Sequence, residues 1–212
     1  MIYKENSKNP WEEISLSDYE NHMSLDSVQQ LQTMNQLMRE QFSDYPVQTA
    51  MVLGIAGGNG LEHVDSSKYR KVYGVDINAD YLHAVKKRYA SLGEVLECLQ
   101  IDLTQDYASL PESELLIANL LIEYIGYDVF QKAVKQVNPK YVSCVIQINT
   151  DENTWVSDSP YIHAFDKLDA VHHQMEESEQ SQAMAEIGYQ KIKQSAEPLP
   201  NGKKLVRIDF QR

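Results

Sequence analysis

Two short stretches of the chain combine residue types that bind a nucleoside. The first runs from Met51 to Val64, MVLGIAGGNGLEHV, and consists of an apolar run, a glycine-rich turn and the expected start of a helix. The second, Val72 to Asp76, is the apolar run VYGVD, which ends on a carboxylate. A glycine-rich turn between a strand and a helix lets backbone N–H groups approach a polar ligand, and a carboxylate at the next strand's tip can accept both hydroxyls of a ribose. We therefore expect a site for a cofactor that contains a nucleoside.

The spacing of the glycines argues against a nicotinamide dinucleotide. Its fingerprint is G-x-G-x-x-G/A, whereas the chain from Gly58 to His63 reads GNGLEH. His63 stands where a small residue would allow the helix to pack closely on the strand. An NAD-dependent oxidoreductase is therefore a disfavoured alternative.

The same stretch resembles the first motif of class I S-adenosylmethionine-dependent methyltransferases, which reads apolar, apolar, acid, x, G-x-G-x-G. Gly54 stands at the acidic position, and Ala56, Gly58 and Gly60 stand at the three glycine positions. The resemblance implies S-adenosylmethionine (SAM) as cofactor and S-adenosylhomocysteine (SAH) as product. In the family the acid helps to hold the methionine end of the cofactor. The alternative is therefore a non-catalytic binding or scaffold protein with the same fold and a degenerate cofactor site.

Composition restricts the class of partner. The chain has 212 residues, of which 42% are hydrophobic, and a formal net charge of −12. Such a charge argues against a nucleic-acid partner, because phosphate binding needs clustered Lys and Arg. No apolar run approaches the roughly 18 residues of a membrane span, and the first residues, MIYKENSKNPWEEI, lack an apolar signal-peptide core. Cys98 and Cys144 lie in strand-like runs and are expected to be buried thiols. We expect a cytoplasmic protein that acts on a small molecule, and the sequence does not indicate its oligomeric state.

Residues 1–46 precede the first strand and have a helical pattern. Ser17 to Glu20, SDYE, have the form of a capping box, and Ser24 is a candidate N-cap for a second helix with apolar residues at helical spacing. We interpret this segment as an N-terminal helical cover within the same domain. It is either a lid over the site or a helix packed on the domain.

From residue 47 to 212 strands and helices alternate, which predicts an α/β fold. The expected strands are Met51–Ala56, Lys71–Val75, Val95–Ile101, Leu115–Ala118, Tyr141–Ile148, Tyr189–Ser195 and Lys203–Phe210. Helices are expected to begin near Asn59 and after the cap Asn78, the latter ending at Gly93, and further helices to run from Tyr127 to Val137 and up to Ile187. Residues 149–177 interrupt the alternation as an insertion, with a polar loop at 149–153 and a helix around Phe165.

The last two strands are joined by the turn from Pro198 to Gly202, which predicts a hairpin. Five strand–helix units followed by an antiparallel pair are typical of the methyltransferase fold. We therefore predict a Rossmann-like three-layer sandwich. Its seven-stranded, mostly parallel sheet has an antiparallel C-terminal hairpin strand.

Ligands of open α/β sheets bind at the carboxyl ends of the strands. By the resemblance, Asp76 accepts the ribose hydroxyls, Asp102 binds the adenine amino group and the Leu103 N–H meets the ring. Either carboxylate could instead cap a helix or turn. The cofactor-binding residues expected from the resemblance are Gly54, Ala56, Gly57, Gly58, Gly60, Asp76, Ile77, Asp102, Leu103 and Asn119.

Catalytic residues cannot be assigned from a motif, because methyl transfer depends mainly on alignment of the reactants. Asn119 ends the fourth strand, where the family lines the methyl-transfer site, but the following LLIEY is not the N-P-P-aromatic motif. The candidates by residue type are Asn119, Glu123, His22 and Tyr19, with His163 as a further possible base.

The inserted segment contains a histidine pair and two aromatic residues. His172 and His173 precede Glu176 and Glu177, yet no third ligand follows at a metal-binding spacing, so we expect solvated surface and no metal. Trp155 and Tyr161 either line an acceptor pocket or pack the insertion onto the sheet.

Overall fold

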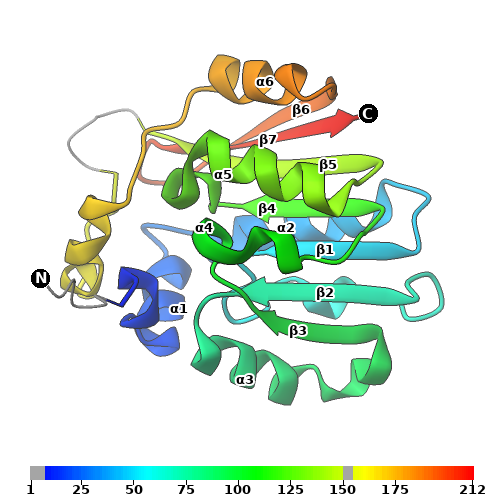
Figure 1. Ribbon diagram of the computed structural model, residues 1–212. Coiled ribbons are helices and arrows are strands. Elements are labelled where there is room, and N and C mark those ends of the chain that lie inside the picture. Colours follow the sequence, from blue (N-terminus) through cyan, green and yellow to red (C-terminus); the bar gives the residue numbers. More distant parts are fainter. Residues whose placement is uncertain (1–7, 150–154) are drawn as a thin grey trace, which may run out of the picture.

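Seven strands form a single sheet in the computed structural model, which describes residues 8–149 and 155–212. The strands are β1 Thr49–Leu53, β2 Lys71–Asp76, β3 Leu96–Gln100, β4 Leu115–Asn119, β5 Tyr141–Ile148, β6 Gln190–Pro198 and β7 Lys204–Gln211. Their order is β3-β2-β1-β4-β5-β7-β6 (Figure 1). The first five strands are parallel, and β7 pairs antiparallel with both β5 and β6. The predicted sheet and its C-terminal hairpin are confirmed.

The helices lie between the strands and before the first of them. The α-helices are α1 Leu16–Ser24, α2 Gln30–Ser43, α3 Ala79–Arg88, α4 Leu103–Asp106, α5 Ile122–Val137 and α6 Glu177–Glu186. Short 3-10 turns are η1 Pro10–Glu12, η2 Leu61–His63, η3 Ala90–Val95, η4 Tyr107–Ser109 and η5 Ile162–Ala170. The polar loop predicted at 149–153 lies, apart from Asn149, outside the described residues.

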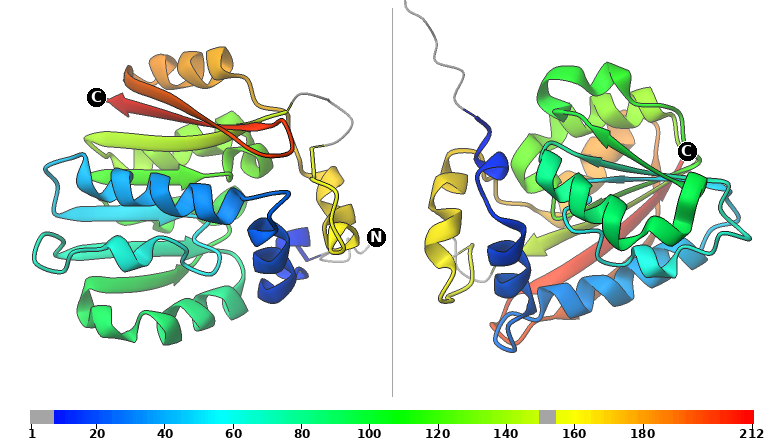
Figure 2. Two further views of the ribbon diagram at one scale, coloured as in Figure 1. Left: turned by 180° about the vertical axis from the view of Figure 1, so that it is seen from behind. Right: turned by 90° about the horizontal axis from the view of Figure 1, so that it is seen from below.

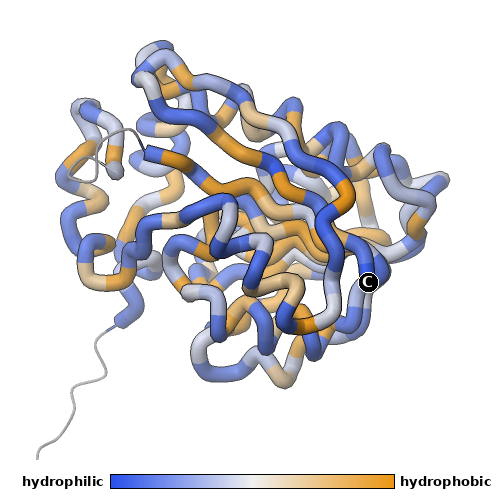
Figure 3. The backbone as a smooth tube through the Cα atoms, turned by 90° about the horizontal axis from the view of Figure 1, so that it is seen from above, coloured by the Kyte–Doolittle hydropathy of each residue, from blue (hydrophilic) through white to orange (hydrophobic). Residues whose placement is uncertain are grey.

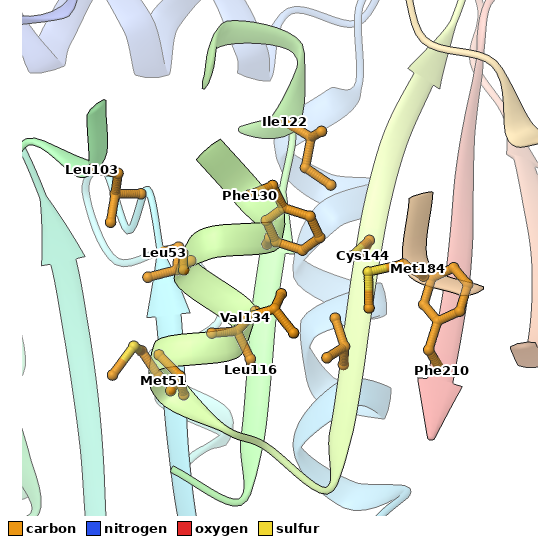
Figure 4. Close-up of a cluster of buried hydrophobic side chains, with 14 of the residues drawn as sticks. Met51, Leu53, Leu103, Leu116, Ile122, Phe130, Val134, Cys144, Met184 and Phe210 are labelled. Carbon is orange, nitrogen blue, oxygen red and sulfur yellow. The ribbon is translucent and has the colours of Figure 1, made fainter. Parts of the chain in front are cut away.

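Helices cover both faces of the sheet, as Figure 2 shows from behind and from below. Because side chains alternate along a strand, β1 sends Met51 and Leu53 to one apolar cluster and Val52 to the other. Figure 4 shows Phe130 and Val134 of α5 packed in the first cluster, while α2 and α3 cover the opposite face. The hydrophobic segments in Figure 3 accordingly follow the strands. The predicted three-layer sandwich is confirmed.

The helix predicted to begin near Asn59 is absent. Between β1 and β2 the chain forms only the 3-10 turn η2, with Gly60 before it at φ +91°. Beyond it, Asp65 accepts hydrogen bonds from the Ser67 N–H and hydroxyl at 2.8 and 2.7 Å, which favours a turn over a helix. The apolar side of α2 packs against this face, including Leu61 of η2, so the face is covered without a helix there.

Several helix boundaries also differ from the prediction. The cap of α1 is Ser15, whose Oγ accepts from the Asp18 N–H at 3.1 Å, and not Ser17. Ser24 is the last residue of α1, and α2 begins only after Gln29, which has a left-handed backbone. Beyond Asn78, which caps α3 as predicted, the helix ends at Arg88.

The helix expected around Phe165 is present, as the 3-10 helix η5. One further expectation needs correction. Cys144 is buried as predicted, but Cys98 is only half-buried because β3 is an edge strand.

A buried ionic network holds α2 against β5 and β7. Arg207 and Asp209 of β7 are both fully buried, and the guanidinium donates to the carboxylate at 3.0 and 2.5 Å. The same guanidinium donates to Asp44, just after α2, at 2.8 Å. Asp209 also accepts from the hydroxyls of Tyr45 and Ser143, each at 2.5 Å. Each of the two buried charges therefore has an opposite charge and further hydrogen-bonding partners, without which its burial would be costly.

Arg207→Met is expected to destabilise the protein by about 3–5 kcal/mol, because it leaves the Asp209 carboxylate buried without its counter-ion. Lys193→Met is the matched control, since Lys193 also pairs with Asp44, at 2.8 Å, but is partly exposed. Its loss is expected to cost less than about 1 kcal/mol. Urea unfolding measures both, and equal losses would contradict the assigned role of Arg207.

Candidate functional site

A cavity opens at the carboxyl edge of the parallel strands. It encloses about 770 Å³, counted out to the mouth where it meets solvent. The loops that follow β1, β2, β3 and β4 form its floor, and η1 and α1 cover it from the N-terminal side (Figure 1). We call it the first cavity. Of the expected cofactor residues it is lined by Gly54, Ala56, Asp76, Ile77, Asp102, Leu103 and Asn119.

Asp76 lies at the tip of β2 with its carboxylate tied to the backbone on two sides. One oxygen accepts from the Ala56 N–H at 2.9 Å, and the other accepts from the Asn78 N–H at 2.9 Å. Burial raises the pKa of Asp76, and the two N–H donors oppose that shift. The carboxylate thus fixes the glycine-rich loop against β2 while it lines the cavity.

The loops after β1 and β4 both use left-handed backbone. Gly54 has φ +69°, Ala56 has φ +46° and Leu120 has φ +51°. A side chain makes this conformation costly for Ala56 and Leu120. Such strain, when neighbouring structure imposes it, is concentrated at functional sites. At Gly54 an added Cβ would lie 3.0 Å from the Leu121 side chain, so the two loops are in close contact.

Asp102 follows β3 and is the N-cap of α4. Its Oδ1 accepts from the Thr104 N–H at 2.9 Å and from the Thr104 hydroxyl at 2.7 Å. The capping alternative for Asp102 is therefore present in the structure, and the residue also lines the cavity. Leu103 beside it is buried and supplies apolar surface together with Ile101.

The remaining glycines of the motif lie away from the first cavity. At Gly57 an added Cβ would meet the paired side chains of Glu20 and Arg88. At Gly58 it would lie 2.7 Å from the Tyr89 ring, and at Gly60 2.4 Å from Met38. The structure shows close packing against α1, α2 and the end of α3 at these three positions, and Gly57 also lines a further cavity.

The N-terminal segment is attached directly to the cavity wall. The Asn78 side-chain amide donates to the Trp11 carbonyl at 3.0 Å, and the Tyr81 hydroxyl donates to the Ile14 carbonyl at 3.0 Å. Trp11 and Tyr19 line the cavity and meet edge to face, with ring centroids 6.0 Å apart. Burial and the nearby Asp76 raise the pKa of the Tyr19 hydroxyl, which keeps it protonated.

Asn119 at the tip of β4 faces α2. Its amide and that of Gln41 exchange two hydrogen bonds of 2.9 Å each. Gln41 is fully buried and also donates to the Ser143 hydroxyl at 2.8 Å. Asn119 is thus connected through Ser143 to the buried Arg207 and Asp209 pair.

A second cavity adjoins the first and encloses about 550 Å³, again counted to its mouth. Tyr19 and Tyr124 line both cavities, whereas His22 and Glu123 line only the second. His22 Nδ1 is 2.8 Å from the Ser159 hydroxyl. Glu123 is buried in the first turn of α5, and burial raises its pKa to about 7.

The inserted segment contributes to this second cavity. Trp155 and His172 both line it and stack with centroids 3.9 Å apart, so the prediction that His172 is solvated surface is wrong. The reason is the Trp155 ring, from a part of the insertion with no regular pattern. His163 and His173 are exposed, and Tyr161 packs on a small apolar cluster around Phe165. Within the described residues no three metal-binding side chains gather.

Sequence reasoning missed several wall residues. Trp11, Tyr124 and Leu121 line the first cavity, and Gln30 and Gln147 line the second. Tyr124 and Leu121 follow directly after the fourth strand, which is the position that could have indicated them. Gln147 lies near the carboxyl end of β5, the edge where ligands of such sheets bind. Trp11 and Gln30 come from elements whose place relative to the sheet is set by tertiary packing.

Comparison with known proteins supports the fold. No family model matches the chain, and no curated protein matches it. Among solved structures it is similar to a magnesium protoporphyrin IX methyltransferase from Synechocystis PCC 6803 with bound SAH, with a TM-score of 0.67 and 10% identity over 92% of this chain and 93% of that one. It is also similar to a cyclopropane synthase from Mycobacterium tuberculosis, with a TM-score of 0.63 and 10% identity over 90% and 88% of the two chains.

A third similar structure is an O-methyltransferase family protein from Burkholderia thailandensis, with a TM-score of 0.64 and 14% identity over 93% of this chain and 59% of that one. The chain therefore has the class I SAM-dependent methyltransferase fold, as its sequence predicts. Within residues 8–149 and 155–212 no helix combines the length and apolar character needed to cross a membrane.

Glu123→Gln is expected to stabilise the protein at alkaline pH. A buried carboxyl whose pKa is raised on folding loses stability as pH rises from its unfolded value toward about 7. The glutamine stays neutral. Its side-chain oxygen can still accept a hydrogen bond from the Gln147 N–H, which in the wild type lies 2.9 Å from Oε1 of Glu123. Above about pH 8 the free energy of unfolding of the variant should exceed that of the wild type by on the order of 3 kcal/mol. Below about pH 4.5 this difference should vanish.

Urea unfolding across this pH range measures that gap. Glu112→Gln is the matched control, because Glu112 lies exposed in the loop before β4. A gap for Glu123→Gln that does not change with pH would show that the Glu123 carboxyl is not held in a desolvated site.

Proposed function

We propose that the protein catalyses SAM-dependent methyl transfer to a small-molecule acceptor. The observation that carries the proposal is the first cavity, where the tips of β1 and β2 bring Gly54, Ala56 and Asp76 together under the N-terminal segment. The neighbour from Synechocystis, whose structure holds SAH, supports the same choice of cofactor. We further propose that residues 1–46 act as a cover over the domain formed by 47–212, and that the protein works in the cytoplasm.

The residues around the first cavity fit such a cofactor. A carboxylate offers about four lone-pair sites, and Asp76 uses two of them for backbone N–H donors, so two remain for ribose hydroxyls. Ile77 and Leu103 offer apolar surface to a purine ring. The rings of Tyr19 and Tyr124 line the same space, and aromatic faces attract cations such as a sulfonium.

SAM supplies an electrophilic methyl group, so the protein's own contribution is alignment of the reactants and exclusion of water. The hydrogen bonds from Asn78 and Tyr81 hold the N-terminal segment over the carboxyl edge of the sheet. Asn119, fixed by Gln41, keeps the tip of β4 in place beside the cavity.

Two observations favour a second candidate, a non-catalytic binding protein with a degenerate cofactor site. No carboxylate stands at the Gly54 position, and no α-helix follows the glycine-rich turn, so that turn lacks the N-terminal helix dipole that supports bound anions. The two candidates differ in whether the chain binds SAH.

Calorimetric titration with SAH, with NAD as the control ligand, tests the proposed function. We expect the wild type to bind SAH with micromolar affinity and not to bind NAD. Asp76→Asn is expected to lose at least about tenfold in affinity, since it replaces a charged acceptor by an amide with only one acceptor oxygen. The matched control is Asp80→Asn, two residues into α3 and exposed, which should bind as the wild type does.

Thermal melting of Asp76→Asn establishes that the variant is folded, because Asp76 also fixes the Ala56 and Asn78 backbone. A wild type that binds neither ligand would support the non-catalytic candidate. Equal affinity of Asp76→Asn and Asp80→Asn for SAH would show that Asp76 does not contribute to SAH binding.

A further inference from the structure

The walls of the second cavity are mainly rings. Trp11, Tyr19, Tyr124, Trp155 and Phe165 line it. Tyr124 stands near the centre of this group, with its ring 4.8 Å from Trp11 and 6.1 Å from Trp155 between centroids. Rings in such number favour a flat ligand, because offset stacking and edge contacts add to the energy of burial.

One polar group in this cavity has unused hydrogen-bonding capacity. Glu123 Oε1 accepts from the Gln147 N–H at 2.9 Å, but Oε2 is buried and has no hydrogen-bond partner among the described residues. Leaving a buried carboxylate oxygen unpaired costs free energy, so native structures generally give such atoms a partner. A ligand that donates a hydrogen bond would satisfy it.

The other polar groups of the cavity are already paired or uncharged at neutral pH. Burial lowers the pKa of His22 and His172 to about 4, so both imidazoles are neutral. The Gln30 amide donates to the Gln147 side-chain oxygen, and Gln147 donates to the Trp155 carbonyl at 2.9 Å. Nζ of Lys203 donates to the same Trp155 carbonyl at 2.5 Å. Apart from Glu123, the residues that line this cavity therefore offer no charge to a ligand.

We propose that the second cavity binds the methyl acceptor, and that this acceptor is a flat, uncharged ring compound whose O–H or N–H group donates to Oε2 of Glu123. This inference rests on the proposed function. The shared wall residues Trp11, Tyr19, Leu120 and Tyr124 place the second cavity directly beside the first, so an acceptor there would face a cofactor bound in the first.

Glu123 then has a proton-transfer role as well. The O–H or N–H bond of the acceptor breaks, its proton passes to Oε2, and the electron pair stays on the acceptor atom, which becomes the stronger nucleophile. A carboxyl whose pKa lies near 7 is suited to take up a proton at neutral pH and release it afterwards to solvent.

The test compares pairs of flat ring compounds that differ in whether they carry a hydrogen-bond donor. Beta-naphthol and indole each have the flat body and the proton donor, while beta-methoxynaphthalene and N-methylindole keep the shape and lack the donor. Ligand-observed NMR titration of the full chain gives the four dissociation constants. We expect each donor probe to bind at least about tenfold more tightly than its methylated counterpart, as for a hydrogen bond to a charged group.

Glu123→Gln should reduce this preference to less than about threefold, since its side chain keeps the bond to Gln147 but has no second acceptor oxygen. Glu112→Gln, exposed before β4, should keep it. Trp155→Leu should weaken all four probes, because it removes a wall of the cavity. No preference in the wild type, or an unchanged preference in Glu123→Gln, would overturn the proposal.

SAH titration on the same samples separates this proposal from the proposed function. A chain that binds SAH but shows no preference for the donor probes contradicts the acceptor site alone. A chain that binds the donor probes through Glu123 but not SAH contradicts the proposed function, and with it the role of the bound ring compound as a methyl acceptor.

Discussion

The position of α2 on the sheet is the constraint on which the rest of the structure depends. No α-helix lies between β1 and β2, in residues 54–70, and α2 covers that face of the sheet from the N-terminal side. Apolar packing alone is non-directional. The buried pair of Arg207 and Asp209, bonded to Asp44 and Tyr45 at the end of α2, fixes one position and orientation. A shift of α2 would separate Arg207 from Asp44 and Asp209 from the Tyr45 hydroxyl, so each buried charge would lose a hydrogen-bonding partner.

This arrangement determines the geometry of both cavities. Gln41 of α2 holds Asn119 at the tip of β4. Of the residues that follow, Leu120 lines both cavities, Leu121 the first and Glu123 the second. The N-terminal segment that leads into α2 lies at the same edge of the sheet. Its hydrogen bonds with Asn78 and Tyr81 hold it beside the first cavity, and His22 of α1 lines the second. One helix position therefore connects the stability of the fold to the shape of the site.

The sequence was sufficient for features that depend on local pattern and not for those that depend on distant partners. The bounds of β5, the hairpin of β6 and β7, and the cap at Asn78 follow from alternation, turn residues and side-chain chemistry, and each is observed. The helix expected near Asn59 failed because the space on the sheet is taken by α2. Arg207 and Asp209 alternate with apolar residues in β7, but Asp44 is 163 positions away from Arg207, so no local signal indicates that α2 is bonded to this pair. Glu123 was a candidate by type only, and its unpaired oxygen is a property of packing.

The central claim is that a nucleoside cofactor binds at the carboxyl edge of the sheet beneath the N-terminal segment. Amide hydrogen exchange with and without SAH tests it most directly, because it locates the bound ligand along the chain. We predict slower exchange in three segments, 54–57, 76–78 and 102–104, and in residues 9–19, of which Asn9, Trp11 and Tyr19 line the first cavity. Unchanged exchange in all four segments, or slowing confined to β6 and β7 on the far side of the sheet, would contradict the account.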